Sequence, residues 1–204
     1  MSDPPHAISA STDWRRFHET TKGREPRPVF LRALELLGPE RGRHAIDLGF
    51  GDGTETRFLL ASGWSVDAID SEPTATSALR ASTPEGDREA LRVRVARLEE
   101  VELTRADLVY AGYSLPFCPP ERFAALWDRI THALSPGGML AGQLFGPNDT
   151  WAGDPDMTFV DRTALDALLE GFDVLSVEEQ DEDGDSFVGT KHWHVFHVIA
   201  TAAA

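Results

Sequence analysis

The sequence predicts an α/β fold: a doubly wound, seven-stranded, mostly parallel sheet with an antiparallel C-terminal hairpin strand. Between residues 28 and 171, short apolar runs alternate with amphipathic segments of helical length, which is typical of repeated βα units. From residue 172 onwards, two apolar runs flank an acidic stretch into which no helix fits. These two runs should pair as antiparallel strands, because a parallel pair needs a long crossover.

Length and composition indicate one cytoplasmic domain. A chain of 204 residues can bury a substantial core. Its formal charge of −15 makes a phosphate backbone a poor partner, so we expect no nucleic-acid binding. No apolar run is long enough to span a membrane, and the N-terminus lacks the apolar core of a secretory signal. The single cysteine, Cys118, excludes an internal disulfide, and we expect it to be buried and unreactive.

The N-terminal part divides into a tail and a structured segment. Residues 1–12 are polar and proline-bearing, which predicts a disordered tail. Residues 13–204 should form one domain, with an N-terminal lid and helix at 13–38 and the core sheet at 43–201. Pro28 suits the first position of a helix that ends before Gly38.

Periodicity and turn residues place the remaining elements. Strands are expected at 44–48, 64–69, 91–95, 106–111, 139–145, 172–177 and 192–200. Helices are expected at 28–37, 54–62, 73–81, 119–134 and 161–169. The helix at 119–134 has the clearest apolar stripe, and the glycines of 135–138 end it. Asp161 should cap the next helix, and the acidic segment 178–184 is expected to be a turn.

A glycine-rich turn follows the first strand and is the strongest candidate for a binding site. Gly49, Gly51 and Gly53 allow positive φ and a close approach of a ligand to the main chain, at a helix N-terminus. The dinucleotide fingerprint needs glycine where Thr54 stands. Asp47 would repel a diphosphate but suits a cationic amine. We therefore expect a ligand with an amino group; the alternative is that the glycines serve turn geometry alone.

A second acid, Asp70, ends the second strand. An ionised carboxylate accepts hydrogen bonds only, so Asp70 can bind hydroxyl groups of a ligand. The alternative is an acid that caps the helix beginning at Pro73.

In these motifs the chain resembles the class I S-adenosylmethionine-dependent methyltransferases. The resemblance covers about residues 28–200 and rests on Asp47-x-Gly49-x-Gly51-x-Gly53, Asp70, the turn at 134–138 and the terminal hairpin. The segment 14–28 and the small size are similar to the tellurite-resistance-type, small-molecule branch. The resemblance implies a Rossmann-like methyltransferase fold, S-adenosylmethionine as cofactor and S-adenosylhomocysteine as product.

The resemblance also implies where the cofactor binds. Asp47 and the turn would face its amino acid end, Asp70 its ribose, and Leu98 or Glu99 its adenine. Arg97 departs from the family, which often has an acid after the third strand. The expected cofactor-binding residues are Asp47, Gly49, Phe50, Gly51, Gly53, Thr54, Asp70, Ser71, Leu98, Glu99 and Tyr113.

The methyl acceptor should lie beyond the carboxyl end of the fourth strand. Tyr113 is the best local candidate to line that site; the alternative is ordinary packing. The segment lacks the Asp/Asn-Pro-Pro-Tyr/Phe motif of methyltransferases that act on nucleobase amines. Ser114 stands in a near match to a hydrolase nucleophile elbow, but Pro116 replaces the second glycine.

The histidines near the C-terminus and one near the N-terminus are base candidates. On a strand, His192 and His194 share a face and His197 points to the other, so the three cannot form one metal site, and we expect no metal. Either His192 or His194 could act as a base, orient the substrate or pack on the sheet. His18 is the other catalytic candidate beside Tyr113. Trp14 and Phe17, in a lid, and Trp151 are the expected substrate-binding residues.

The sequence therefore predicts methyl transfer to an O, N or S atom of a small molecule by in-line displacement. The main alternative is a non-catalytic module that binds the cofactor or a partner on the same fold. A nicotinamide oxidoreductase is disfavoured by Thr54 and Asp47, and a nucleic-acid methyltransferase by the charge and the missing motif. The acceptor and the oligomeric state are left open.

Overall fold

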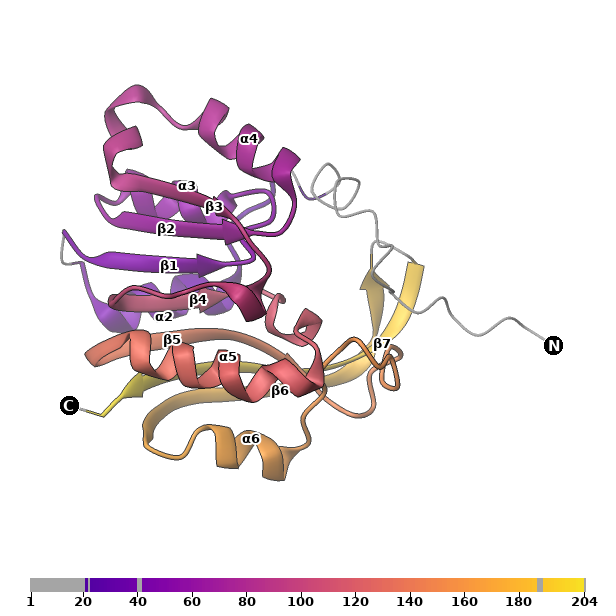
Figure 1. Cartoon of the computed structure of the whole chain (residues 1–204). Coiled ribbons are helices and arrows are strands. Elements are labelled where there is room, and N and C mark those ends of the chain that lie inside the picture. The colour runs from indigo at the N-terminus through magenta and orange to yellow at the C-terminus, as the bar shows by residue number, and fades with distance from the viewer. Residues whose placement is uncertain (1–20, 22, 40–41, 187–188, 204) are drawn as a thin grey trace.

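One seven-stranded sheet forms the centre of the molecule (Figure 1). The structure is a computed structural model that describes residues 21, 23–39, 42–186 and 189–203. The strand order is β3-β2-β1-β4-β5-β7-β6. Neighbours from β3 to β5 run parallel, whereas β7 is antiparallel to both β5 and β6. The predicted fold class is thus confirmed.

The observed elements follow the predicted ones closely as far as β5. The strands are β1 (His44–Leu48), β2 (Ser65–Asp70), β3 (Leu91–Val95), β4 (Ala106–Ala111), β5 (Leu134–Phe145), β6 (Phe172–Ser186) and β7 (Gly189–Ala202). The helices are α2 (Pro28–Leu37), α3 (Thr54–Ala61), α4 (Pro73–Ser82), α5 (Pro120–Ala133) and α6 (Arg162–Leu168), with short 3-10 helices η1 (Glu85–Ala90), η2 (Leu98–Glu100) and η3 (Leu115–Phe117). None of the helices in these described ranges is long and apolar enough to cross a bilayer.

The helices cover the sheet from both sides. In Figure 1, α5 and α6 lie in front of the strands and α2 and α3 behind them. Apolar residues of α5 and α6 share one buried cluster with the sheet, and those of α2, α3 and α4 share the other. As predicted, the Asp161 carboxylate caps α6 by accepting a hydrogen bond from the Ala164 N–H at 2.8 Å.

The start of β5 is irregular. Ala106 pairs with Leu134 and Leu108 pairs with Met139, so the residues between Leu134 and Met139 bulge out of the β4–β5 ladder. Regular pairing then follows from Met139, where the sequence predicted the strand to begin.

The prediction of an acidic turn at 178–184 was wrong, because these residues continue β6. Each of them pairs with a residue of β7, from Glu178 opposite His197 to Gly184 opposite Lys191. β6 is the edge strand of the sheet, so water solvates many of its carboxylates, and such charges protect an edge from further pairing.

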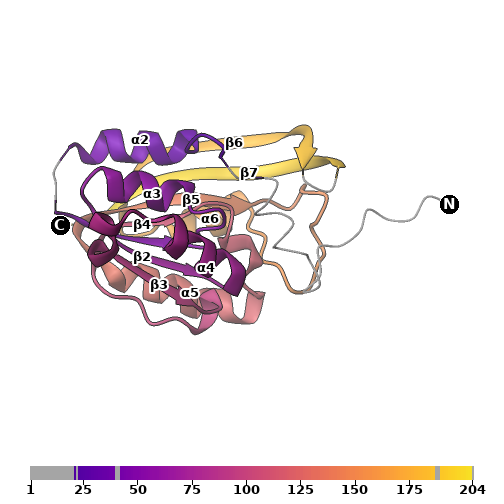
Figure 2. The same cartoon turned by 90° about the horizontal axis from the view of Figure 1, so that it is seen from above.

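This longer hairpin extends beyond the rest of the sheet. β5 pairs with β7 only between Val195 and Thr201, so β7 before Val195 pairs with β6 alone. Figure 2 shows the two strands reaching past the other elements as a ribbon. The loop after β5 is hydrogen-bonded to it, through the Thr150 N–H and the His192 carbonyl at 3.0 Å. The ribbon thereby borders the carboxyl ends of β4 and β5.

Candidate functional site

The glycine turn joins β1 to α3 and lies against the end of β4. Gly49, Gly51 and Gly53 have φ of 74°, 58° and 76°, conformations that side-chain-bearing residues rarely adopt. A Cβ on Gly49 would lie 2.4 Å from the Ser114 Cβ. The Ser114 hydroxyl donates to the Leu48 carbonyl and so joins this turn to the segment after β4. The predicted turn therefore forms, and Ser114 serves it as a structural donor.

Asp47 is a buried carboxylate beneath the turn. Its Oδ2 accepts a hydrogen bond of 2.6 Å from the Thr56 hydroxyl in α3. It takes part in no salt bridge among the residues that the structure describes. Burial, reinforced by the nearby Glu55 carboxylate, raises the pKa of Asp47 to about 8. A cation that entered the site would favour the ionised form.

Glu55, which the sequence reasoning missed, connects the N-terminal segment to this site. It is 2% exposed in the first turn of α3 and receives both terminal nitrogens of Arg24, at 2.6 and 2.5 Å. The Arg27 N–H donates to the same carboxylate at 3.1 Å. Burial alone would raise the pKa of Glu55, but the bonds from Arg24 hold it below its usual value. The signal available in the sequence was an acid in the first turn of a helix, which needs a cation as partner once it is buried.

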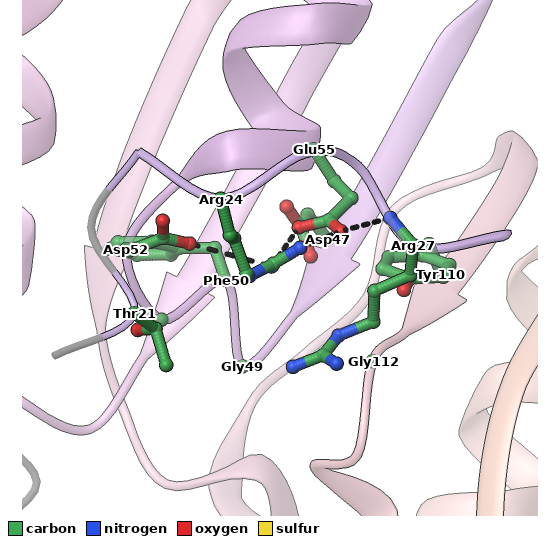
Figure 3. Close-up of a pocket in the computed structure, with 11 residues that line it drawn as sticks. Thr21, Arg24, Arg27, Asp47, Gly49, Phe50, Asp52, Glu55, Tyr110 and Gly112 are labelled. Carbon is green, nitrogen blue, oxygen red and sulfur yellow. Dashed lines mark hydrogen bonds and ion pairs between the residues drawn. The ribbon is translucent and has the colours of Figure 1, made fainter. Parts of the chain in front are cut away.

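These groups line a pocket, drawn in Figure 3. Of the predicted residues it contains Asp47, Gly49, Phe50 and Gly51. The lining residues that the sequence did not predict are Thr21, Arg24, Arg27, Asp52, Glu55, Tyr110 and Gly112. Tyr110 is 2% exposed, and its hydroxyl has no hydrogen-bond partner among the described residues. The pocket thus combines carboxylates, guanidinium groups and a buried hydroxyl with exposed glycine backbone.

Asp70 lies at the end of β2 beside the turn. Its two carboxylate oxygens accept backbone N–H groups of Gly51 and Glu72, each at 2.9 Å. Ser71 follows it and is exposed. Asp70 therefore fixes the glycine turn against the loop before α4, in addition to its predicted role at a ribose.

The predicted adenine residues lie beyond β3. Leu98 and Glu99 belong to the short helix η2. Arg97, the departure from the family pattern, forms a salt bridge with the Glu99 side chain. The Arg129 guanidinium of α5 donates to the Glu99 carbonyl at 2.8 Å. Charged neighbours thus fix the segment, and its part in adenine binding stays a prediction.

Tyr113 occupies a strained position after β4. Its φ of 61° is the only positive value of a non-glycine residue in the described part of the chain. Such strain is often found at functional sites. Its N–H donates to the Gln143 Oε1 at 3.0 Å, and the Arg27 guanidinium lies 4.5 Å from its ring centroid. The rings of Phe145, Trp193 and His197 lie 6.2, 6.0 and 6.2 Å from it.

The structure brings His197, rather than His192 or His194, close to Tyr113. His197 lies beside Gln143, with 3.3 Å between its Nδ1 and the Gln143 amide nitrogen. His192 and His194 lie on the opposite face of β7, as alternation predicts. His192 is held between two carboxylates of β6, Asp181 at 2.7 Å and Asp183 at 2.8 Å.

His194 is packed into a polar cluster on that opposite face. Its Nε2 lies 3.0 Å from Glu179, and its Nδ1 accepts the Asn148 N–H at 3.1 Å. Glu179, Asp181 and His194 place potential metal-ligand atoms within 4.8 Å of one another. Because Nδ1 is an acceptor, the neutral ring carries its proton on Nε2, which then donates to Glu179. The cluster is therefore satisfied by hydrogen bonds.

The remaining predicted residues are either packed or undescribed. Trp151 is 5% exposed and lies against Lys191, whose ammonium is 3.3 Å from its ring centroid and bonded to Asp149. Burial raises the pKa of the Cys118 thiol to about 11, consistent with an unreactive thiol. Trp14, Phe17 and His18 lie outside the described residues.

Comparison with known proteins agrees with this geometry. Residues 46–140 match the family described as "Methyltransferase domain". A carboxy-S-adenosyl-L-methionine synthase from Trichlorobacter lovleyi is 30% identical over 105 residues, which cover 48% of this chain and 43% of the relative. The chain thus spans less than half the length of this relative.

Solved structures share the fold at low identity. TehB from Haemophilus influenzae has a TM-score of 0.73 and 14% identity, over 87% of this chain and 62% of that one. The Burkholderia thailandensis 1,6-didemethyltoxoflavin-N1-methyltransferase, with bound 1,6-didemethyltoxoflavin and S-adenosylhomocysteine, has a TM-score of 0.67 and 20% identity, over 87% and 78%. The predicted resemblance is therefore confirmed: residues 46–140 match a methyltransferase domain, and the chain shares the fold of TehB and of the toxoflavin methyltransferase.

Proposed function

We propose that this chain transfers a methyl group from S-adenosylmethionine to an O, N or S atom of a small molecule. The observation that carries the proposal is the glycine turn over the buried Asp47, which makes no salt bridge among the described residues, beside the aromatic rings around Tyr113. The first can hold the amino acid end of the cofactor. The second offers an apolar place for an acceptor at the end of β4.

The residues of the pocket fit the cofactor's amino acid end. An ammonium group would supply the positive charge that the buried Asp47 carboxylate lacks. The buried Tyr110 hydroxyl, without a partner among the described residues, would gain one from a polar ligand. Because Gly49 has no side chain, its backbone can lie directly against the ligand.

The other predicted contacts complete the binding site. Asp70 and Ser71 would hold the ribose, and Leu98 and Glu99 the adenine, while Gly53 and Thr54 begin helix α3. Asp70 lies beside the glycine turn, and an ionised carboxylate is an acceptor for ribose hydroxyls. S-adenosylmethionine supplies an already activated methyl group, so the protein mainly has to orient the acceptor and exclude water.

The acceptor would lie among Tyr113, Trp193 and His197. Aromatic rings would contact the acceptor, and such surroundings favour a small molecule that is largely apolar. We retain Tyr113 as a residue that touches the acceptor, and we add His197 as a base or orienting group in place of His192 and His194. The formal charge of −15 supports a small molecule over a nucleic acid. His18, Trp14 and Phe17 stay predictions for the lid.

Calorimetric titration with S-adenosylmethionine and S-adenosylhomocysteine tests the proposal. Wild type should bind both, and Asp70→Ala should weaken binding by about 1–3 kcal/mol, because ribose hydroxyls would lose their acceptor. Asp173→Ala changes an exposed acid of β6 and is the control. Binding of a nicotinamide dinucleotide in place of S-adenosylhomocysteine would refute the proposal.

The second candidate is a module that binds the cofactor without catalysis. The observation behind it is that carboxylates of β6 bind both His192 and His194, so neither offers a base to the pocket. Incubation with methyl-labelled S-adenosylmethionine and a metabolite extract separates the two. Label in any small-molecule fraction supports the enzyme; cofactor binding without transfer supports the module.

A further inference from the structure

Arg27 carries a positive charge that no carboxylate of the described chain neutralises by direct contact. Its backbone is fixed, because its N–H donates to Glu55 and Pro28 follows it. Its buried Nε has no hydrogen-bond partner among the described residues. Figure 3 shows its guanidinium turned away from Glu55, toward the part of the pocket lined by Gly49 and Gly112. The group is therefore available to a ligand.

Arg24 provides the contrast within the same segment. Both of its terminal nitrogens bind Glu55, and one lies 3.4 Å from Asp52. The amino acid end of the pocket thus has a cation with its own counter-ions. Arg27 instead extends toward the opposite side, where its guanidinium lies 4.5 Å from the Tyr113 ring centroid.

The groups around Arg27 at this end are neutral. Burial raises the pKa of Tyr113 above that of a free phenol, although Arg27 opposes the shift. Burial lowers the pKa of His197, and Arg27 acts in the same direction while Glu178 opposes it. Near neutral pH the aromatic site therefore holds an uncharged phenol, a largely uncharged imidazole and the guanidinium of Arg27. The guanidinium is the positive charge of this site, although Glu178 acts on His197 and Glu55 accepts the Arg27 N–H.

We propose that Arg27 makes the site specific for an acceptor that carries a carboxylate on a planar, apolar body. A guanidinium binds a carboxylate through two parallel hydrogen bonds and, unlike an ammonium, can do so while stacked on an aromatic ring. The half-buried rings of Tyr113 and Trp193 would contact the planar body, and the buried Phe145 ring packs against both of them. This inference rests on the proposed function and names the class of its substrate.

Matched pairs of small ligands test the inference. Benzoate against benzamide, and phenylacetate against phenylacetamide, differ in charge but hardly in shape. Their binding to the full chain saturated with S-adenosylhomocysteine can be measured by ligand-observed NMR titration. Wild type should bind each carboxylate at least about ten-fold more tightly than its amide, the size of one charged hydrogen-bonded contact.

Variants separate charge from packing. With each variant saturated with S-adenosylhomocysteine, Arg27→Gln should abolish the preference and Arg27→Lys should keep part of it. Arg32→Gln, on the exposed face of α2, is the matched control and should behave as wild type. Thermal unfolding of each variant confirms that it is folded.

Three results would overturn the inference. Equal or undetectable binding of both members of each pair would show that the site does not select an anion. A large loss of S-adenosylhomocysteine affinity in Arg27→Gln, with the preference unchanged, would assign Arg27 to the cofactor's own carboxylate. Failure of wild type to bind S-adenosylhomocysteine would overturn the proposed function itself, and this inference with it.

Discussion

Replacing Asp47 by asparagine should stabilise the ligand-free protein at neutral and basic pH. The two side chains are nearly equal in size, and an asparagine oxygen can still accept the Thr56 hydroxyl that binds Asp47 at 2.6 Å. The difference is that aspartate can ionise under the glycine turn, beside a second carboxylate, Glu55, whereas asparagine cannot. The substitution thus removes the ionisable group and keeps the hydrogen bond.

The size of the effect follows from proton linkage. The pKa of Asp47 rises from 3.8 to about 8, chiefly through burial, so the folded state binds the proton more tightly than the unfolded state. This contribution to stability is full below the unfolded pKa and is lost as the pH rises to about 8. At about 1.4 kcal/mol per pKa unit, wild type is about 4 kcal/mol less stable at pH 7 than below the unfolded pKa, because the unfolded chain has released a proton that the folded chain still holds. The asparagine variant escapes this loss.

Urea unfolding between pH 5 and pH 8.5, without cofactor, measures the difference. The free energy of unfolding of wild type should fall with pH relative to that of Asp47→Asn, which should be more stable by several kcal/mol at the basic end. Asp173→Asn, at an exposed acid of β6, controls for the loss of a charge alone. A variant no more stable than wild type at pH 8, or two parallel pH profiles, would refute the reasoning. The same variant should bind S-adenosylhomocysteine more weakly, because the ammonium loses its counter-ion.

Two further substitutions test the turn and the aromatic cluster. Gly49→Ala should lower stability by about 1–3 kcal/mol, because a φ of 74° is strained for alanine and the new Cβ would lie 2.4 Å from the Ser114 Cβ. Thermal unfolding measures the change. An unchanged midpoint would contradict the close approach. Lys191→Met should cost about 3–5 kcal/mol, because it leaves the fully buried Asp149 carboxylate without its cation. Chemical unfolding measures this loss of stability. Adding Asp149→Asn to the variant should restore much of the lost stability. A double variant as unstable as Lys191→Met would show that lost packing, not the unpaired charge, causes the destabilisation.

The part of the fold that follows local rules was predictable. The turn from Gly49 to Gly53 needs positive φ at three residues, and only glycine adopts it freely. The Asp161 cap is likewise read from a few adjacent residues. The acidic half of β6 could not be predicted as a strand, because a dense run of charges favours a turn when the segment is considered alone. It is a strand because β7 offers it a partner, and the edge position leaves its acids in water.

The charged parts of the site depend on contacts between distant segments. Arg24 reaches Glu55 across 31 positions, and the residues next to either one do not indicate the partner.

For β7, alternation correctly separates His197 from His192 and His194 but does not say which face meets Tyr113. Both faces carry apolar residues, so hydrophobicity could not decide. That choice follows from the order β5-β7-β6, which sets Gln143 of β5 opposite His197. The carboxamide of Gln143 then receives the Tyr113 N–H and lies 3.3 Å from the His197 ring, so it fixes both groups on one side of the sheet. For an acceptor at Tyr113, as proposed, a base or orienting group would come from this side, where His197 lies and His192 and His194 do not.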